Sequence, residues 1–415
     1  MVSSTTQLTA TLPSDLKRSN RMQILEKFRS GNACTASQIA EEIGVSRQTV
    51  MKAIQFFTAK GLVVSLGKSH STSVGGKPPE LFSLSTRRYL LSVSLWPDRQ
   101  QLTLMNLRGE TLAVRSLPEA LSESVEAAME TIGKISGELL SGCGVALEAV
   151  SGVCVSTSGT VNYHTNTLKF NSLRPAWGRN LPIAERLAPY FAPGTPILVE
   201  NVAKVVGRSI LHKPELEHKR MISVFSSWGG VCASFIENDR ILNGKDSLIG
   251  EIGHMIIAPE DAEKCGCGSH GCFERMVSNE RLRKNIASTL AAHPESALNA
   301  LCTERVTVGD LFAASDRGDA YARQLAAQLA RYFAMALRNV SLVFDPELVV
   351  LQGEYAAADE TFCAQLRRAL SDFRYYPEGG PFELRLDRRP ISELDVRGAH
   401  VLLIDHLFSD PELYV

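Results

Sequence analysis

The sequence lacks several features that would assign a function at once. Its 415 residues contain no run of about 18 uncharged apolar residues, which excludes a helix that spans a bilayer. The first residues, 1–13, lack the basic and then apolar pattern of a secretory signal, so we expect a cytoplasmic protein whose nine cysteines are reduced. The net charge is only −1, and taken alone this value argues against nucleic-acid binding.

What is present is an ordinary soluble composition, with 44% hydrophobic and 21% charged residues. The length predicts two or three domains. The charge is unevenly distributed among them. Residues 1–88 hold twelve Lys/Arg and five Asp/Glu, a net charge of +7, whereas residues 89–415 hold 32 and 40, a net charge of −8. Such asymmetry indicates a nucleic-acid-binding module joined to a different kind of domain.

The basic segment has the pattern of a winged helix-turn-helix over residues 14–88, behind a disordered stretch at 1–13. Apolar residues recur at helical spacing over 16–28, and Thr35 and Gln38 form a predicted capping box for a second helix. Gly44 ends that helix, and Ser46 caps a third over 47–60. Two short helices joined by a tight turn are typical of a helix-turn-helix, whose second helix enters the major groove.

This interpretation makes the start of the third helix the surface that contacts DNA. Segments 62–66 and 81–84 are predicted to pair as a wing, with a Gly/Ser/Pro-rich tip between them. A module for dimerisation or protein docking is the alternative, which the charge asymmetry disfavours. The predicted DNA contacts are Arg47, Gln48, Thr49 and Lys52 of the helix, and Lys68 and Lys77 of the wing.

The acidic body alternates strands with helices, which predicts an α/β architecture with ligands bound at strand ends. A hairpin is expected at 90–95 and 102–105. Buried strands are expected at 150–155, 195–199, 221–225 and 348–351, and helices at 119–140, 279–290 and 320–343.

The most specific chemical signal is a cluster of Cys265, Cys267 and Cys272 within eight residues. In a cytoplasmic chain this spacing favours a structural Zn²⁺ site over a disulfide. A redox-sensing thiol cluster is the alternative. The spacing leaves the fourth ligand open between His254 and His270.

These motifs, together with the helix-turn-helix in front of them, resemble those of the ROK family (repressors, open reading frames, kinases), in particular its NagC/XylR-type transcriptional regulators. The resemblance extends over nearly the whole chain. The segments that carry it are Gly250-Glu251-Ile252-Gly253-His254, Cys265-x-Cys267-Gly268-x-x-Gly271-Cys272-x-Glu274, Gly75-Gly76-Lys77-Pro78, Asp345-Pro346-Glu347-Leu348-Val349-Val350-Leu351-Gln352-Gly353 and Gly398-Ala399.

The resemblance implies a body of two actin-like (ribonuclease H-like) lobes with a sugar bound between them. The first lobe would comprise residues 89–205 and a C-terminal helix at 396–415. The second would comprise 206–395, with the zinc motif and a dimerisation surface. The resemblance also favours His254 as the fourth zinc ligand.

Sugar contacts are implied in the same way for Glu251, His254 and Glu274. Carboxylates that accept from vicinal hydroxyls would discriminate between sugars. Asn201 and Asn171, or Ser172 beside the latter, are further candidates. The alternative for both asparagines is that they only cap turns.

The chain departs from the kinases of the family where phosphoryl transfer needs particular residues. The catalytic aspartate of their Glu-Asn-Asp-Ala segment is Val202 here, and valine takes no proton. Their Asp-x-Gly-Gly-Thr phosphate loop corresponds to Ser94-Leu95-Trp96-Pro97-Asp98, and their Gly-Thr-Gly loop to Trp228-Gly229-Gly230. We therefore expect no ATP-dependent phosphorylation.

The sequence thus predicts a homodimeric regulator, or pairs of such dimers, that binds palindromic operator DNA and responds to a sugar or sugar phosphate. Repression of carbohydrate uptake or catabolism genes is the expected role. A sugar kinase with an added DNA-binding domain is one alternative. A regulator controlled by a protein partner instead of a sugar is the other.

Overall fold

The computed structural model describes residues 13–68, 78–96, 99–118, 121, 124–171, 173–217, 219–227, 230–372 and 382–409. Among them, no helix is long and apolar enough to cross a membrane. The predictions that lie outside the described residues concern the segment 1–12, Gly75-Gly76 and Lys77 of the wing, Pro97-Asp98 of the first phosphate loop, Ser172, Trp228-Gly229 of the second loop, and residues 410–415 of the expected C-terminal helix.

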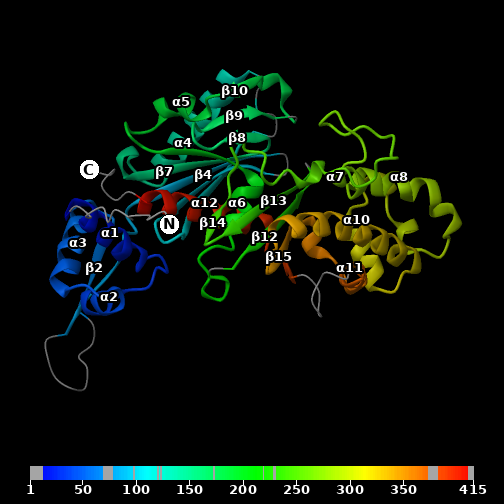
Figure 1. Cartoon of the computed structure of the whole chain (residues 1–415). Helices are drawn as coiled ribbons and strands as arrows, with labels where there is room; N and C mark the ends of the chain where they lie inside the picture. Colours follow the sequence, from blue (N-terminus) through cyan, green and yellow to red (C-terminus); the bar gives the residue numbers. More distant parts are fainter. Residues whose placement is uncertain are drawn as a thin grey trace, which may run out of the picture.

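The N-terminal domain packs helices and a three-stranded sheet, in the order β1-β3-β2, around one apolar core (Figure 1, blue). The predicted capping box is present, with Thr35 and Gln38 each bonding the other's backbone N–H, and Gly44 ends the helix at φ 70°. β2 and β3 pair antiparallel, which confirms the wing strands. The elements are α1 (Pro13–Glu26), β1 (Cys34–Thr35), α2 (Ala36–Ile43), α3 (Arg47–Ala59), β2 (Val63–Lys68) and β3 (Glu80–Leu84).

The first lobe is built on a five-stranded sheet of order β11-β7-β4-β5-β6, in which β11, β7 and β4 run parallel. Side chains of β4 alternate between two cores. Leu91 and Val93 pack with α4, whereas Leu90 packs with the C-terminal helix α12. The strands are β4 (Tyr89–Trp96), β5 (Arg99–Asn106), β6 (Thr111–Ser116), β7 (Val150–Thr157) and β11 (Ile197–Asn201).

Smaller elements complete this lobe. The helix expected from residue 119 begins only at Val125, because Ser124 caps it by accepting from the Ala127 N–H, so that expected start was wrong. A small sheet of order β10-β9-β8 covers the end of the larger one. The elements are α4 (Val125–Gly142), β8 (Thr160–Asn162), β9 (Thr167–Phe170), β10 (Arg179–Leu181) and α5 (Ile183–Leu187).

The second lobe has its own five-stranded sheet, of order β14-β13-β12-β15-β16. Its core is made with the long helix α10 and the helices around it. The elements are β12 (Met221–Ser227), β13 (Gly230–Glu237), β14 (Arg240–Ile241), α7 (Phe273–Met276), α8 (Asn279–Thr289), α9 (Val308–Asp316), α10 (Ala320–Phe344), β15 (Leu348–Gly353), α11 (Glu360–Ser371) and β16 (Glu383–Asp387).

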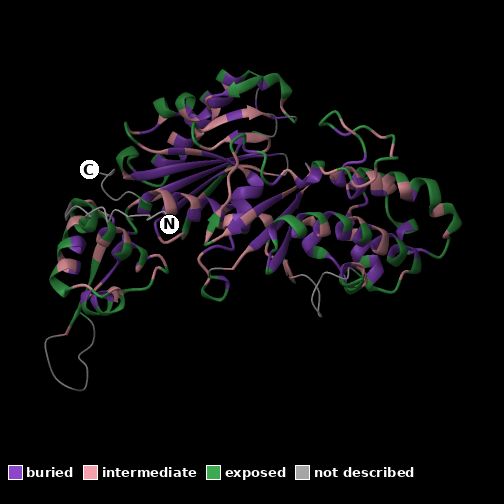
Figure 2. Cartoon of the chain, viewed as in Figure 1, coloured by how far each residue is buried: buried purple, intermediate pink, exposed green. Residues whose placement is uncertain are grey.

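Two helices, α6 (Val202–Arg208) and α12 (Ile391–Ser409), lie between the two sheets (Figure 1). The C-terminal helix begins at Ile391, five residues before its expected start, and the expected lobe boundary after residue 205 falls inside α6. Figure 2 shows that the strands of both lobes are buried around these helices. The two-lobed α/β body behind a helix-turn-helix is the predicted fold.

Candidate metal and sugar site

The strongest site in the second lobe is a group of one histidine and three cysteines. One ligand atom from each of His254, Cys265, Cys267 and Cys272 lies within 4.8 Å of the others. His254 ends the short helix Ile252–His254, and Cys272 precedes α7. His270, the other candidate ligand, is exposed and is not a member of this group.

The spacing of these atoms fits a tetrahedral metal. Two thiolates at about 2.3 Å from Zn²⁺ lie about 3.8 Å apart, and a thiolate and an imidazole nitrogen about 3.6 Å apart. The structure has Cys267 Sγ 3.7 Å from Cys272 Sγ, and Cys265 Sγ 3.6 Å from His254 Nδ1. Gly271 lets the loop close tightly, because at φ 66° a Cβ there would meet the Ala258 carbonyl oxygen at 2.1 Å. The cluster can therefore hold a metal ion.

Two glutamates flank His254. Glu274 Oε1 lies 3.4 Å from Nδ1, and Glu251 Oε2 lies 3.9 Å from Nε2. The imidazole thus presents Nδ1 to the cysteines and Nε2 to Glu251. Burial raises the pKa of the Glu251 carboxyl; the nearby His254 opposes this shift, and the Glu274 carboxylate adds to it.

A small cavity between the lobes brings Glu251 together with Asn201. It is lined from the first lobe by Gly159 to Val161 and from the second by β13 and the loop before Glu251. Its volume is about 10 Å³, room for about one water molecule. Lys169 Nζ, on β9, bonds the Asp246 carbonyl oxygen at 3.0 Å and so joins the two lobes across this region.

The two predicted asparagines make internal hydrogen bonds. Asn201 caps α6 by accepting from the Ala203 N–H, and its amide donates to the Gly159 carbonyl at 2.8 Å. Asn171 is buried, donates to Ser158 Oγ at 3.0 Å and accepts from the Leu173 N–H. Asn171 does not line the cavity that holds Asn201 and Glu251.

Trp96 and Val202, the residues at which the sequence is expected to depart from the kinases, lie together in an apolar cluster. Trp96, at the end of β4, is 2% exposed and packs edge-on against Phe225 of β12, with ring centroids 6.2 Å apart. Val202 and Leu394 belong to the same cluster. First-lobe and second-lobe residues therefore meet here in an apolar contact.

One buried cation beside the cavity escaped the sequence analysis. Lys204 is 5% exposed, and its ammonium donates to Asn243 Oδ1 at 2.7 Å. Burial lowers its pKa, whereas the nearby Glu200 and Glu251 carboxylates raise it. The signal lay in the segment Glu200-Asn201-Val202-Ala203-Lys204, where a lysine one turn into a buried helix needs a partner.

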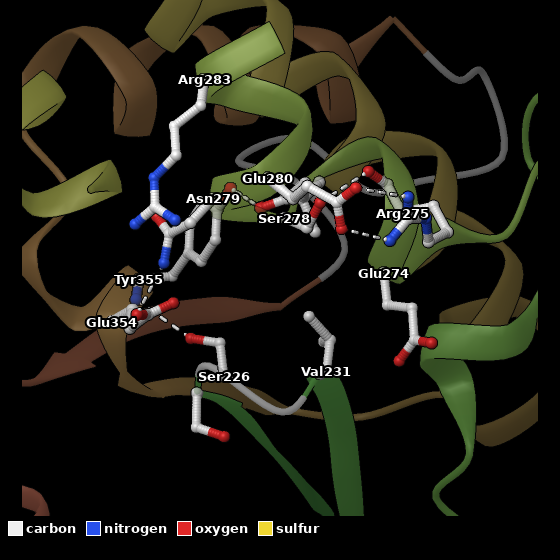
Figure 3. A pocket seen from close by; sticks show the side chains of 13 residues that line it. Ser226, Val231, Glu274, Arg275, Ser278, Asn279, Glu280, Arg283, Glu354 and Tyr355 are labelled. Carbon is white, nitrogen blue, oxygen red and sulfur yellow. Dashed lines mark hydrogen bonds and ion pairs between the residues drawn. The ribbon is translucent and has the colours of Figure 1, made fainter. Parts of the chain in front are cut away.

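A further hollow of about 170 Å³ is lined by residues of β12, β13, α7 and α8, and Glu274 is one of them (Figure 3). Its charged and polar groups are largely paired with one another. Arg275 binds Glu280 at 2.9 Å, Asn279 donates to Glu354 at 2.8 Å, and Arg283 donates through Nε to the Val306 carbonyl. The hollow is therefore polar but internally balanced.

The predicted DNA contacts lie at the start of α3 and at the end of β2. Arg47, Gln48 and Lys52 are exposed, as is Lys68. Thr49 is half-buried, and its hydroxyl lies 2.9 Å from Ser46 Oγ in the helix cap. Arg21 of α1 has a structural position that the sequence did not predict. It is buried, and its guanidinium stacks on the Phe56 ring of α3.

Comparison with known proteins matches residues 91–403 to the ROK family and residues 20–69 to a helix-turn-helix (HTH) domain. The xylose repressor of Caldicellulosiruptor bescii is 20% identical over 402 residues, 96% of this chain and 98% of its own. A glucokinase of Halalkalibacterium halodurans is 23% identical over 284 residues, 68% of this chain and 84% of its own. A crystal structure of a ROK family transcriptional regulator, a homologue of the E. coli MLC protein, superposes with TM-score 0.76 at 18% identity, covering 95% of this chain and 98% of that one.

Proposed function

The chain belongs to the ROK family, and from this premise we propose that it is a sugar-responsive DNA-binding repressor of carbohydrate genes without kinase activity. The observation that carries the proposal is the apolar contact of Trp96, Val202 and Phe225 beside the polar group of Asn201 and Glu251. One side of the cleft keeps groups suited to hydroxyls. The other side is packed with apolar side chains where the resemblance places the first phosphate loop of the kinases.

The glucokinase relatives make a kinase the alternative to test. A valine at position 202 cannot accept the proton of a sugar hydroxyl, and the loss of a general base slows such reactions by about 10²–10⁴-fold. The buried Trp96 ring supplies neither the backbone donors nor the space that a phosphate loop needs. The alignment with the xylose repressor covers 96% of the chain, whereas that with the glucokinase covers 68%.

The His254 and cysteine cluster is proposed to hold one structural Zn²⁺ per chain. The sulfur and nitrogen spacings support tetrahedral coordination by four protein ligands. Bound zinc would fix the loop 265–272 against the Ile252–His254 turn. The imidazole would then be anchored through Nδ1, with Nε2 directed toward Glu251.

Sugar binding is proposed to use Glu251, His254, Glu274 and Asn201, with Asn171 supporting the pocket through Ser158. A cavity of about 10 Å³ is too small for a pyranose, so the lobes must separate to admit one. The Lys169 contact to the Asp246 carbonyl is one that this motion would break. A sugar would thereby select an open arrangement of the lobes.

A continuous series of contacts runs from this cavity to the DNA-binding domain. Asn201 caps α6, which packs along α12. Near the end of α12, Asp405 binds His212 at 3.0 Å and Arg29, just after α1, at 2.7 Å. A change of lobe angle at α6 would shift the helix to which the DNA-binding domain is attached, and so alter operator affinity.

Operator binding is proposed for a homodimer, with one α3 helix per half-site of a palindrome. Arg47, Gln48, Thr49 and Lys52 would contact bases and phosphates, and Lys68 and Lys77 of the wing the adjacent backbone. The exposed start of α3 supports this use.

The proposal is tested by mapping the DNA that the protein binds across its genome and measuring release from one such site by a panel of sugars and sugar phosphates. We expect sites beside carbohydrate genes and one sugar that weakens binding at least tenfold. ATP turnover with any sugar of the panel would favour the kinase instead.

Asn171 and Asn201 already use their side chains in internal hydrogen bonds instead of offering them to a sugar. This observation favours one other function, a regulator controlled by a protein partner. A thermal-shift screen distinguishes the two. A ligand at 100 times its dissociation constant stabilises the folded state by about 2.7 kcal/mol. Stabilisation by no sugar or sugar phosphate would favour the protein partner.

A further inference from the structure

A basic hollow lies on the first lobe between β5, β6 and the first half of α12, with a volume of about 650 Å³. Four arginines line it, together with one carboxylate, Glu393, which lies 3.7 Å from Arg389. Its lining shares no residue with the cavity of Asn201 and Glu251 or with the hollow of Figure 3. The arginines are Arg99, Arg108, Arg389 and Arg397.

Two of these arginines lie beside a carboxylate that offsets their charge, and two do not. Arg389 binds Asp387 at 2.7 Å, and Arg99 lies 3.6 Å from the buried Asp395. Within the part of the chain that the structure describes, Arg108 and Arg397 have no carboxylate at ion-pair distance. Arg108 donates through Nε to the Leu84 carbonyl at 3.2 Å. The hollow therefore carries uncompensated positive charge.

The side chain that faces Arg397 is a histidine, which does not neutralise its charge. His400 donates through Nε2 to the Leu107 carbonyl at 2.9 Å, so its Nδ1 is an acceptor and faces Arg397 Nη1 at 3.5 Å. Burial lowers the pKa of His400 to about 4, so the imidazole is neutral at pH 7. Burial also lowers the pKa of Arg397, and Arg29 and Arg389 lower it further through repulsion of like charges, whereas the Asp405 carboxylate opposes this shift. An anion would relieve this repulsion.

We propose that this hollow binds the phosphate group of a small metabolite, either inorganic phosphate or a phosphate monoester. Guanidinium groups match phosphate oxygens with paired N–H donors. Thr111 and Ser392 line the same hollow, and their hydroxyls could supply further donors. The hollow also lies at the N-terminal end of α12, a helix of 19 residues whose dipole favours an anion there.

The position of the hollow gives such a ligand a route to the DNA-binding domain. Arg108 holds the carbonyl of Leu84, the last residue of wing strand β3. A phosphate that drew the Arg108 guanidinium toward Arg397 would act on the junction between the domains. This site is separate from the proposed sugar pocket and does not depend on it.

The test is calorimetric titration of the full-length protein in phosphate-free buffer with inorganic phosphate, a hexose 6-phosphate and the unphosphorylated hexose. We expect at least one phosphate-bearing probe to bind, and Arg397→Gln and Arg108→Gln each to weaken that binding at least tenfold. Arg115→Gln is the matched control, because Arg115 is an exposed residue of the same sheet, 3.5 Å from Glu138 and outside the hollow. Thermal melting of each variant checks that the fold is retained.

The probes also separate the two sources of phosphate. Tighter binding of the hexose 6-phosphate than of inorganic phosphate identifies a monoester site, and the reverse order an inorganic phosphate site. The proposal is overturned if neither probe binds, or if Arg397→Gln and Arg108→Gln bind them as the wild type does. The same variants losing affinity for a non-operator duplex while phosphate binding is unchanged would assign the hollow to the DNA backbone instead, and would also overturn it.

Discussion

The two sides of the interlobe cleft differ in the chemistry of their side chains. On one side, Asn201 shares a small cavity with Glu251, and Glu251 and Glu274 flank a histidine that faces three cysteines. On the other, Trp96, Val202 and Phe225 form an apolar contact between the lobes. The proposed function accounts for this difference: the polar side would recognise a sugar, whereas the apolar side would contribute packing between the lobes and no reactive group.

The largest effect is expected from the metal cluster. Cys272→Ser removes a buried ligand, and because a structural metal needs its complete ligand set, zinc should fall from one ion per chain to below about a tenth. Elemental analysis of the purified protein measures this content, and thermal unfolding should move to lower temperature. Cys302→Ser, at an exposed cysteine outside the cluster, is the control and should retain all metal. Equal zinc in both variants would contradict the proposed site.

On the packed side, Trp96→Ala should lower the free energy of unfolding by about 3–5 kcal/mol, because it leaves a large cavity in the interlobe contact. Denaturant titration measures the loss. Trp96→Phe, which keeps an aromatic ring against Phe225, should lose less than half as much. A loss below about 1 kcal/mol for the alanine variant would mean that this contact contributes little to stability.

The substitution Val202→Asp restores the missing carboxylate without the missing phosphate loops. We expect ATP turnover with a panel of hexoses and amino sugars to stay at background, because the buried Trp96 ring would still stand where the resemblance places the first phosphate loop. A coupled assay measures the rate, with Val202→Asn as the uncharged control. Turnover by Val202→Asp alone would show that one residue separates this chain from a kinase.

On the polar side, Glu251→Gln should weaken binding of the effector sugar by about 10–100-fold, since it replaces a charged acceptor of hydroxyl hydrogen bonds. Titration calorimetry measures the dissociation constant. Glu260→Gln, an exposed residue of the same lobe, should leave it unchanged. Equal affinity in the two variants would exclude Glu251 from the sugar contacts.

The smallest effects concern single DNA contacts. Arg47→Ala and Lys52→Ala should each lower operator affinity and, where a phosphate contact is lost, reduce the salt slope by about 1. Lys134→Ala, in the body, serves as the control. A salt slope and affinity unchanged in both helix variants would mean that α3 is not the recognition helix.

Local signals in the sequence predicted local structure well. The Thr35–Gln38 capping box and the Ser46 cap depend on residues three apart, and both are present. The spacing of the three cysteines likewise brings them together within one loop. The start of α4 was predicted too early, because the cap is Ser124, whose hydroxyl accepts from the Ala127 N–H.

Long-range packing could not be predicted in this way. The contact of Trp96 with Phe225 joins residues 129 positions apart, and its existence depends on how two sheets close around α6 and α12. The same holds for Lys204, whose partner Asn243 comes from the other lobe. The charge difference between residues 1–88 and the rest was visible in the sequence, but the basic hollow at the start of α12 was hidden within an acidic body.

A single sample can report both the sugar response and the phosphoryl transfer of the protein. Operator DNA, protein, ATP and each sugar of a panel are mixed, and DNA anisotropy and ADP release are recorded together. The account predicts that one sugar weakens operator binding at least tenfold while ADP stays at the level of the sugar-free control. ADP release that depends on the sugar, or operator binding that no sugar changes, would contradict it.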